Sequence, residues 1–245
     1  MSLTNRQIKL INSLHSKKGR KENLKFLVEG EKVILELLNS NWKIDFIVIN
    51  EKYLNDFKQI PNVIYLSEHE ITKLSSLKSN SFGIAVVEMH DPIFSLNELN
   101  GTYIYLDGIR DPGNLGTIIR ICDWYGIKYL FTSLDSTDFY NPKSIISSMG
   151  SFTRIQVIPI EFEKLIQTLS NFQIVGTFLN GTNIYDYQFK NNQIIVLGNE
   201  SQGIRLDIES FIKDRITIPK IGEAESLNVG ISTAIVLDNV FRKKL

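Results

Sequence analysis

The stretch LDGIRDPGNLGTIIRICDW, residues 106–124, places three glycines among polar side chains between two apolar runs. Gly108 and Gly113 have the G-x-x-x-x-G spacing of the P-loop, in which backbone N–H groups cradle nucleotide phosphates. The P-loop continues with Lys and then Ser or Thr, whereas this chain has Asn114 and Leu115 there. A phosphotransferase that uses this loop stays open as an alternative, but the missing side chains argue against it.

Arg120 is a second polar group of this stretch that could act on a ligand. It follows Gly116 by four residues in a segment with helical spacing, so both are expected on one helix face, away from the apolar stripe. Asn114, near the start of the segment, is expected to cap the helix. Because a guanidinium binds phosphates, the pattern indicates a polar ligand beside this face. A capped helix with a surface arginine is the structural alternative.

Two further loops follow apolar, strand-like runs and carry polar residues. Gly176 and Thr177 end the first run and offer close backbone approach and one hydroxyl. Leu197 ends the second run, and Gly198 and Glu200 follow it in LGNESQGI. In parallel α/β sheets ligands bind beyond the carboxyl ends of the strands, so these positions are candidates for a site. Plain polar turns are the competing interpretation.

The fourth candidate loop is IPKIGEAESLNVGIS, residues 218–232, which leads into the last predicted helix. Ile218 ends a strand-like run, and Ser226 and Asn228 lie where the helix is expected to start. The first N–H groups of a helix have no intrahelical partner, so they suit a polar or anionic ligand. Leu227 begins an apolar stripe, and a capped, packed C-terminal helix therefore explains part of this pattern.

Composition argues against several other kinds of site. The three histidines are well apart in the sequence and Cys122 is the only cysteine, so no metal site and no disulfide framework are expected. No apolar window is long enough to span a membrane, and no signal-peptide core follows Met1. These features predict a cytoplasmic protein with no membrane partner and no metal.

Basic and acidic residues both number 27, so any charge that attracts nucleic acid must be local. A local excess occurs in HSKKGRKENLK, residues 15–25, which contains one acidic residue. This stretch is expected to be a loop that contacts nucleic-acid phosphates. Its candidate contacts are the basic side chains Lys17, Lys18, Arg20, Lys21 and Lys25. A solvated surface segment is the alternative.

The elements that must position these loops alternate between helix and strand along the chain. Residues 1–90 predict a small α/β domain, in which Ser67 and Glu70 form a capping box. Residues 91–100 are polar, contain a proline and predict a linker. Residues 101–245 predict a second α/β domain with a mostly parallel sheet covered on both faces. Strands are expected at residues 25–30, 43–50, 62–66, 81–89, 102–107, 127–133, 154–160, 172–179, 192–199 and 215–220.

Taken together, Asn114-x-Gly116-x-x-x-Arg120, LGNESQG and IPKIGEAESLNVGIS resemble the three motifs of the SpoU-type RNA 2′-O-ribose methyltransferases, which belong to the SPOUT class. The resemblance covers residues 102–245. The first domain resembles, more loosely, the ribosomal-protein-like substrate-binding domain of many such enzymes, through FLVEGEKVI and its strand–helix order. For the fold, the resemblance implies a C-terminal trefoil knot, a topology that general rules for chain connections disfavour.

The resemblance also implies a cofactor, a substrate and an assembly. The cofactor is S-adenosylmethionine, the substrate is RNA, and the enzyme is a homodimer whose site is completed across the interface. By position, the implied cofactor contacts are Thr177, Leu197, Gly198, Ile218, Leu227 and Asn228. The implied catalytic residues are Arg120, Asn114, Glu200, Ser226 and Asn228.

In the family, the residue that matches Arg120 is the proposed catalytic residue. A guanidinium is not a credible base near neutral pH, so we expect Arg120 to bind the neighbouring phosphate and to stabilise the developing alkoxide. The separate first domain favours ribosomal RNA of the 23S type as substrate. A transfer-RNA methyltransferase and a non-catalytic RNA-binding member are the alternatives. Ile146 stands where many relatives have a basic residue, which puts one RNA contact in doubt.

Overall fold

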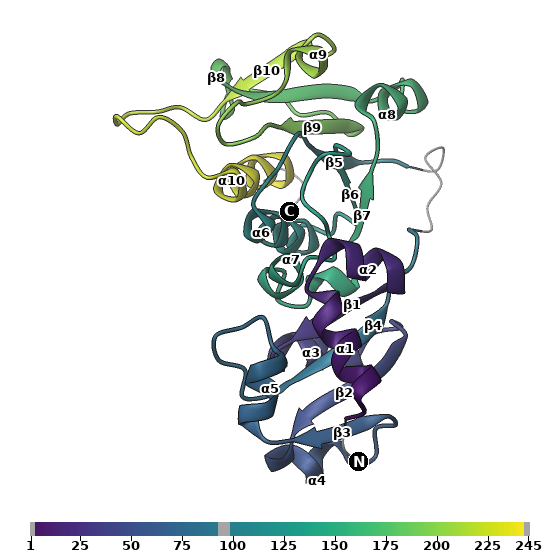
Figure 1. The fold of residues 1–245 in the computed structure, drawn as a ribbon. Coiled ribbons are helices and arrows are strands. Elements are labelled where there is room, and N and C mark those ends of the chain that lie inside the picture. Colours follow the sequence, from purple (N-terminus) through teal and green to yellow (C-terminus); the bar gives the residue numbers. More distant parts are fainter. Residues whose placement is uncertain (1–2, 93–98, 243–245) are drawn as a thin grey trace. The chain divides into compact units, whose positions relative to one another are not determined.

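The chain forms two compact units, seen in a computed structural model that describes residues 3–92 and 99–242 (Figure 1). The first unit comprises residues 1–91 and 138–153, and the second comprises residues 92–137 and 154–245. The centre of the expected linker, residues 93–98, lies outside the described residues. No helix in the described part of the chain is long and apolar enough to cross a membrane.

The first unit is built on a four-stranded sheet with the order β1-β4-β2-β3. Strand β4 runs antiparallel to both of its neighbours, and β2 runs parallel to β3. The strands are β1 (Lys25–Glu29), β2 (Ile44–Asn50), β3 (Val63–Leu66) and β4 (Gly83–Glu88). The helices are α1 (Asn5–Leu14), α2 (Lys17–Asn23), α3 (Glu31–Leu38), α4 (Leu54–Phe57) and α5 (Glu68–Leu74), with a 3-10 turn η1 (Glu51–Tyr53).

A hydrophobic core lies on each face of this sheet, because successive strand side chains point to opposite faces. Phe26 and Val28 of β1 belong to the core that contains the buried face of α3, whereas Leu27 belongs to the core that contains α1 and α5. The capping box predicted at Ser67 and Glu70 is confirmed at the start of α5. Burial on both faces gives this small unit a core of its own.

Residues 138–153 pack with the first unit, although the sequence predicted them within the domain at residues 101–245. This segment contains α7 (Pro142–Ser147) and η3 (Ser151–Thr153). Its Ile145 and Phe152 are buried in the same core as Phe26. Burial of apolar side chains, rather than sequence order, decides which unit a segment joins.

The second unit contains a six-stranded sheet with the order β10-β8-β9-β5-β6-β7, and all neighbouring strands are parallel. The mostly parallel sheet predicted for this part is confirmed. The strands are β5 (Thr102–Leu106), β6 (Tyr129–Thr132), β7 (Gln156–Pro159), β8 (Gln173–Asn183), β9 (Gln193–Leu197) and β10 (Asp214–Thr217). The helices are α6 (Pro112–Trp124), α8 (Phe162–Thr168), α9 (Leu206–Glu209) and α10 (Val229–Phe241).

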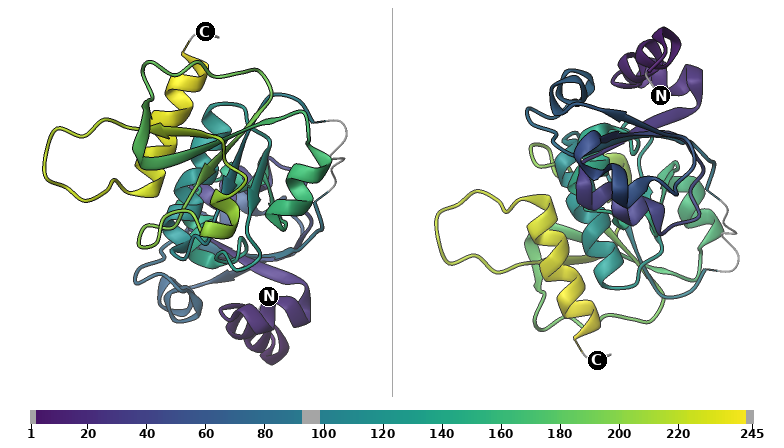
Figure 2. Two further views of the ribbon diagram at one scale, coloured as in Figure 1. Left: turned by 90° about the horizontal axis from the view of Figure 1, so that it is seen from above. Right: turned by 90° about the horizontal axis from the view of Figure 1, so that it is seen from below.

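The strand order changes direction at β5, which lies between β9 and β6. From β5 the chain builds β6 and β7 on one side, and it later builds β8, β9 and β10 on the other. Such a switch point opens a crevice at the carboxyl ends of the strands. Helices α6 and α10 pack against each other, and the segment between β10 and α10 extends away from the sheet as a long loop (Figures 1 and 2).

Two helix starts test the sequence prediction. Asp111 caps α6 through its Oδ1, which accepts a hydrogen bond from the Asn114 backbone N–H (2.9 Å), so the prediction of Asn114 as the cap was wrong. The physical reason is that Pro112 takes the first helical position, so the cap is the residue before it, Asp111. Helix α10 is capped by Asn228, so Ser226 lies before the helix. The side chain of Asn114 is thereby free for another contact.

Candidate active site

Three side chains from the three motif loops form one chain of hydrogen bonds. Asn228 Nδ2 donates to Asn114 Oδ1 (2.9 Å), and Asn114 Nδ2 donates to Glu200 Oε1. In sequence, Asn114 is 86 residues from Glu200 and 114 residues from Asn228. Folding therefore brings together three of the five residues that were expected to be catalytic.

The cap of α10 fixes the direction of this hydrogen-bond chain. Asn228 Oδ1 accepts from the backbone N–H groups of Gly230 (2.9 Å) and Ile231 (3.4 Å). An amide side chain has one acceptor end and one donor end, so Nδ2 of Asn228 must face Asn114. Asn114 then accepts through Oδ1 and presents its own Nδ2 to Glu200. The second carboxylate oxygen of Glu200 has no hydrogen-bond partner within the described residues and is open to a ligand.

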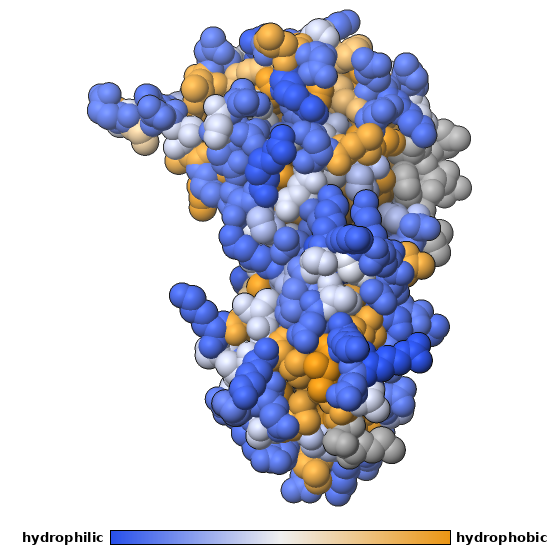
Figure 3. Space-filling view, in the orientation of Figure 1, coloured by the Kyte–Doolittle hydropathy of each residue, from blue (hydrophilic) through white to orange (hydrophobic). Residues whose placement is uncertain are grey.

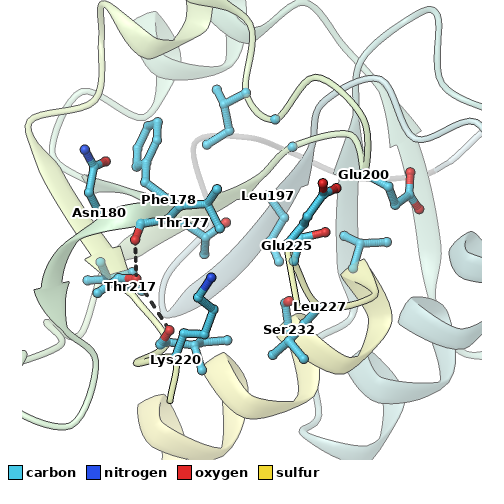
Figure 4. Close-up of a pocket in the computed structure, with 18 of the residues that line it drawn as sticks. Thr177, Phe178, Asn180, Leu197, Glu200, Thr217, Lys220, Glu225, Leu227 and Ser232 are labelled. Carbon is cyan, nitrogen blue, oxygen red and sulfur yellow. Dashed lines mark hydrogen bonds between the residues drawn. The ribbon is translucent and has the colours of Figure 1, made fainter. Parts of the chain in front are cut away.

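A cavity of about 730 Å³, here called the first cavity, opens at the carboxyl ends of β9 and β10 and beside residues 177–180 of β8. Strand β8 continues to Asn183, so the prediction that it ends at residue 179 was wrong. Figure 4 shows side chains from these three strands and from the long loop before α10 around one hollow. Five of the six residues predicted to contact the cofactor line it: Thr177, Leu197, Gly198, Ile218 and Leu227. Glu200 and Ser226 line it as well, whereas Asn228 does not. Its volume is typical of sites for small organic ligands.

The walls of the first cavity combine buried apolar side chains with a few polar groups. Leu197, Ile216 and Val236 are buried wall residues, and the Thr177 hydroxyl donates to the Val196 carbonyl oxygen (3.2 Å). Apolar walls with few polar groups are usual for pockets that hold an aromatic ring system.

The loop after β9 turns back on itself at the edge of this cavity. Asn199 and Gly203 exchange two backbone hydrogen bonds, of 3.0 and 2.8 Å. A Cβ atom at Gly198 would lie 2.1 Å from the Gly203 carbonyl carbon, so only glycine fits there. This close approach explains why the motif has glycine directly after the strand.

Arg120 is the predicted catalytic residue that the fold does not bring to the others. Its side chain is exposed on α6, lines neither this cavity nor the one described next, and makes no ion pair or hydrogen bond with the residues that the structure describes. Six residues after Asn114, an α-helix has turned by about 240° and risen by about 9 Å. Gly116, which was expected beside Arg120, is buried.

A second cavity of about 380 Å³ adjoins the first, and the segment at residues 199–203 lines both. Its other walls include Asp107, Arg110, Asp135 and Arg205, none of which was predicted to be a site residue. The signal that could have found two of them is their position. Asp107 directly follows β5, and Asp135 lies soon after β6, so both obey the strand-end rule that selected Glu200.

The predicted RNA-binding loop at residues 15–25 is largely helical in the structure. Ser16 caps α2 by accepting from the Gly19 backbone N–H (3.0 Å), and a helix of seven residues follows. Because Ser16 starts a helix, the prediction of a loop was wrong. The surface over α2 is strongly hydrophilic in Figure 3, as expected for a basic helix.

The five predicted RNA contacts of this stretch fall into two groups. Lys17, Lys18 and Lys21 are exposed, and Lys18 pairs only loosely with Glu22 (3.7 Å). Lys25 is half-buried and forms an ion pair with Asp45. Arg20, described next, is buried.

The Arg20 side chain is only 2% exposed, and its donors are used inside the unit. Nε and Nη2 donate to Asp138 Oδ2 (3.1 and 2.7 Å), and Nη1 donates to the carbonyl oxygens of Leu14 (2.9 Å) and His15 (3.0 Å). A guanidinium held in this way cannot reach an RNA phosphate. The prediction that Arg20 contacts RNA was therefore wrong, because its hydrogen bonds connect α1, α2 and Asp138 instead.

Comparison with known proteins agrees with this geometry. The family model of the SpoU rRNA methylase family matches residues 101–238, and the MRM3-like substrate binding domain matches residues 5–85. The chain is 27% identical to a 23S rRNA (guanosine(2553)-2′-O)-methyltransferase of Bacillus subtilis, over 96% of each chain. A TrmH-family protein from Porphyromonas gingivalis has 32% identity and a TM-score of 0.85, covering 99% of this chain and 100% of that chain.

A further solved structure contains the cofactor that the motifs predict. It is an AdoMet-bound rRNA methyltransferase from Sinorhizobium meliloti, with 28% identity and a TM-score of 0.86, covering 100% of this chain and 97% of that chain. The family model covers more than half of the chain and includes all three motif loops. The chain belongs to the SpoU rRNA methylase family, as the three motifs predicted.

Proposed function

We propose that this protein transfers a methyl group from S-adenosylmethionine to a ribose 2′-hydroxyl of RNA, and that its substrate is ribosomal RNA of the 23S type. One observation carries the proposal: Asn228, Asn114 and Glu200 join three separate motif loops into one oriented hydrogen-bond chain beside a ligand-sized cavity. The activities of the related rRNA methyltransferases support the reaction and the ribosomal substrate.

The first cavity fits the cofactor in size and in the chemistry of its walls. Leu197, Ile218 and Leu227 supply apolar contacts for an adenine ring, while Thr177 and Gly198 bring backbone groups to its polar edge. Asn228 acts from outside the cavity, through Asn114. When bound there, S-adenosylmethionine supplies a methyl group activated by a sulfonium centre.

The chain's own residues position the ribose and stabilise the charge that develops on its 2′-oxygen. Glu200 has one oxygen committed to Asn114 and one oxygen open, which can accept a hydrogen bond from a ribose hydroxyl. Asn114 cannot turn, because Asn228 holds its other end. Arg120 binds the phosphate next to the target ribose and stabilises the negative charge that develops on the 2′-oxygen in the transition state. A requirement for the 2′-hydroxyl selects RNA over DNA.

Arg120 meets the cluster in a homodimer. Because its exposed side chain makes no ion pair or hydrogen bond with the described residues of its own chain, we assign it to the site of the partner protomer. In the same proposal, the chain after β9 is threaded as a trefoil knot and the protein acts in the cytoplasm. The first unit binds the RNA substrate with the exposed lysines of α2.

Methyl transfer and cofactor binding test the proposal directly. Calorimetry should show binding of S-adenosylmethionine, and unmodified 23S rRNA transcript should acquire label from the tritiated cofactor in ribose. Binding of ATP with Mg²⁺ instead of the methyl donor would favour the phosphotransferase. Cofactor binding without transfer to 23S rRNA or to bulk transfer RNA would point to the non-catalytic alternative, and transfer to transfer RNA alone would correct the substrate.

A further inference from the structure

The second cavity lies beside the cluster that the proposed function assigns to the ribose. Asn114 and Glu200 line it, and the segment at residues 199–203 lines both this cavity and the first cavity. The base of a nucleotide is attached to the ribose carbon next to the one that bears the 2′-hydroxyl. A ribose at Glu200 therefore places its base within reach of this neighbouring cavity, whose volume of about 380 Å³ suits a nucleobase.

The charges of the second cavity disfavour a phosphate. Its lining has four carboxylates, Asp107, Asp111, Asp135 and Glu200, and two guanidinium groups, those of Arg110 and Arg205. Asp107 is buried, and its carboxylate accepts hydrogen bonds from the backbone N–H and the Nε–H of Arg205, at 2.8 Å each. The net excess of negative charge repels an anion, whereas it attracts a neutral base that presents N–H donors.

Asp135 and Arg110 form an exposed edge of this cavity. The Arg110 Nη2 atom lies 3.3 Å from Asp135 Oδ2, and the two side chains are 71% and 40% exposed. A hydrogen bond from Ser133 lowers the pKa of Asp135, and the nearby Arg205 lowers it further, so the group is a carboxylate at neutral pH. Arg205 Nη2 also lies 3.6 Å from Asp135 Oδ1, so each oxygen of this carboxylate has one guanidinium neighbour. A carboxylate oxygen has two lone pairs, so the exposed edge still presents two acceptors followed by a donor.

Only one RNA base complements that order of groups. Guanine presents two adjacent donors, N1–H and N2–H, followed by the O6 acceptor, whereas adenine, cytosine and uracil have no two adjacent ring-edge donors. A carboxylate accepts two parallel hydrogen bonds from such a pair, in the way that it accepts from arginine. Gly108 adjoins this edge, since a Cβ atom on it would make ordinary contacts with Asp135 Oδ2 (4.0 Å) and Asn199 Cβ (3.9 Å), and its φ of +66° favours glycine.

We propose that the second cavity receives the base of the methylated nucleotide and selects guanine, with Asp135 accepting from N1–H and N2–H and Arg110 donating to O6. This assignment rests on the proposed function, and it makes Asp135 and Arg110 specificity-determining residues. Removing one good bidentate contact to a base reduces discrimination by about 10- to 100-fold.

The first test identifies the labelled nucleoside. Unmodified 23S rRNA transcript is methylated with tritiated S-adenosylmethionine, digested to nucleosides and separated by chromatography. The expected product is 2′-O-methylguanosine. Label in another 2′-O-methyl nucleoside overturns the base assignment and leaves the proposed function standing. No label in ribose, with the cofactor bound, overturns the proposed function and the base assignment with it.

The second test assigns the contact to Asp135. An RNA fragment around the mapped site carries either guanosine or inosine, which keeps N1–H and O6 but lacks the 2-amino group. Wild type should prefer guanosine by about 10-fold or more in kcat/KM, and Asp135→Asn should bring the ratio close to one. Arg110→Ala should lower kcat/KM for both fragments equally, because both carry O6. An unchanged guanosine-to-inosine ratio in Asp135→Asn overturns the assignment.

A matched control separates base recognition from general effects of charge. Lys43 and Glu88 form a surface ion pair of similar exposure, 76% and 36%, which lines neither cavity. Glu88→Gln should leave both kcat/KM and the guanosine-to-inosine ratio unchanged. Arg110→Ala removes a highly exposed side chain, so its melting temperature should equal that of wild type, and its loss of rate then reports on the substrate.

Discussion

Two arginines, each predicted from the sequence to meet RNA, have opposite fates in this molecule. Arg20 on α2 is 2% exposed, and its guanidinium binds Asp138 and two carbonyl oxygens inside the first unit. Arg120 on α6 is exposed, and its side chain makes no ion pair or hydrogen bond with the described residues of the chain. One arginine therefore connects elements within its unit, and the other is available to a partner.

The difference shows that a basic residue type in a basic run does not by itself indicate nucleic-acid binding. Arg20 stands among lysines, yet it alone has a carboxylate and two carbonyl oxygens within reach. A guanidinium has five donors in a planar fork, which suits such a set of acceptors better than an ammonium group does. The lysines of the same helix extend into solvent instead.

The largest expected effect on stability comes from Arg20→Ala. The substitution leaves Asp138 without its cation in a largely buried position, and it leaves two carbonyl oxygens without donors. We expect a loss of about 3 kcal/mol in the free energy of unfolding. Urea unfolding followed by circular dichroism measures it, with Lys18→Ala as the exposed control on the same helix. A loss equal to that of the control would mean that Arg20 has no structural role.

Arg120→Ala should give the opposite result, a loss of activity without a loss of stability. Removing a group that stabilises transition-state charge costs about 100- to 1,000-fold in rate. The melting temperature and the affinity for S-adenosylmethionine should stay at wild-type values, because the side chain makes no hydrogen bond or ion pair with a described residue and does not line the first cavity. Equal methyl transfer by wild type and variant would remove Arg120 from the mechanism.

Mixing two inactive variants tests whether Arg120 acts across a dimer. Arg120→Ala and Asn114→Ala are each expected to be inactive. If the site combines residues of two protomers, random exchange of subunits restores about a quarter of wild-type activity, since half of the dimers then have one intact site. If Arg120 acts within its own chain, no mixture regains activity.

Asn228 has both a structural and a proposed catalytic role, because it caps α10 and orients Asn114. Asn228→Asp keeps the acceptor for the cap but loses the donor to Asn114, so we expect wild-type stability and about a 10-fold lower kcat. Asn228→Ala should lose about 1 kcal/mol of stability as well. Thermal melting and methyl-transfer kinetics on the pair separate the two duties. Equal activity of Asn228→Asp and wild type would contradict the role of the hydrogen-bond chain.

The smallest effect is expected from the exposed lysines of α2. Changing Lys17, Lys18 and Lys21 together to alanine should weaken RNA binding by about 10-fold at low salt. The slope of log affinity against log salt concentration should become shallower by the amount that corresponds to about two lost phosphate contacts. Filter binding to 23S rRNA transcript at several salt concentrations measures both. The triple variant of the exposed Lys58, Lys73 and Lys78 has the same charge change and serves as control. Equal slopes in the two variants would exclude α2 from the RNA-binding surface.

The parallel sheet, five residues that line the first cavity and the three members of the hydrogen-bond chain could be predicted from the sequence. The prediction succeeded because strand ends and helix starts are local features, and because ligand sites of parallel sheets follow from them. It missed the second cavity, whose Asp107 and Asp135 obey the same rule but stand outside the motif loops. It also assigned residues 138–153 to the second unit, since the burial of Ile145 and Phe152 involves strands far away in sequence.

By itself, the sequence determined the local elements, their order and the chemical groups available at the strand ends, because periodicity, capping and turn residues act over a few neighbours. Only the tertiary structure decided which of those groups meet. Asn114, Glu200 and Asn228 became one oriented chain because parallel strands end at one edge and a helix cap fixes one amide. Arg20 and Arg120 differ for the same reason, because residues distant in sequence decide whether a guanidinium is buried in an ion pair or remains exposed to solvent.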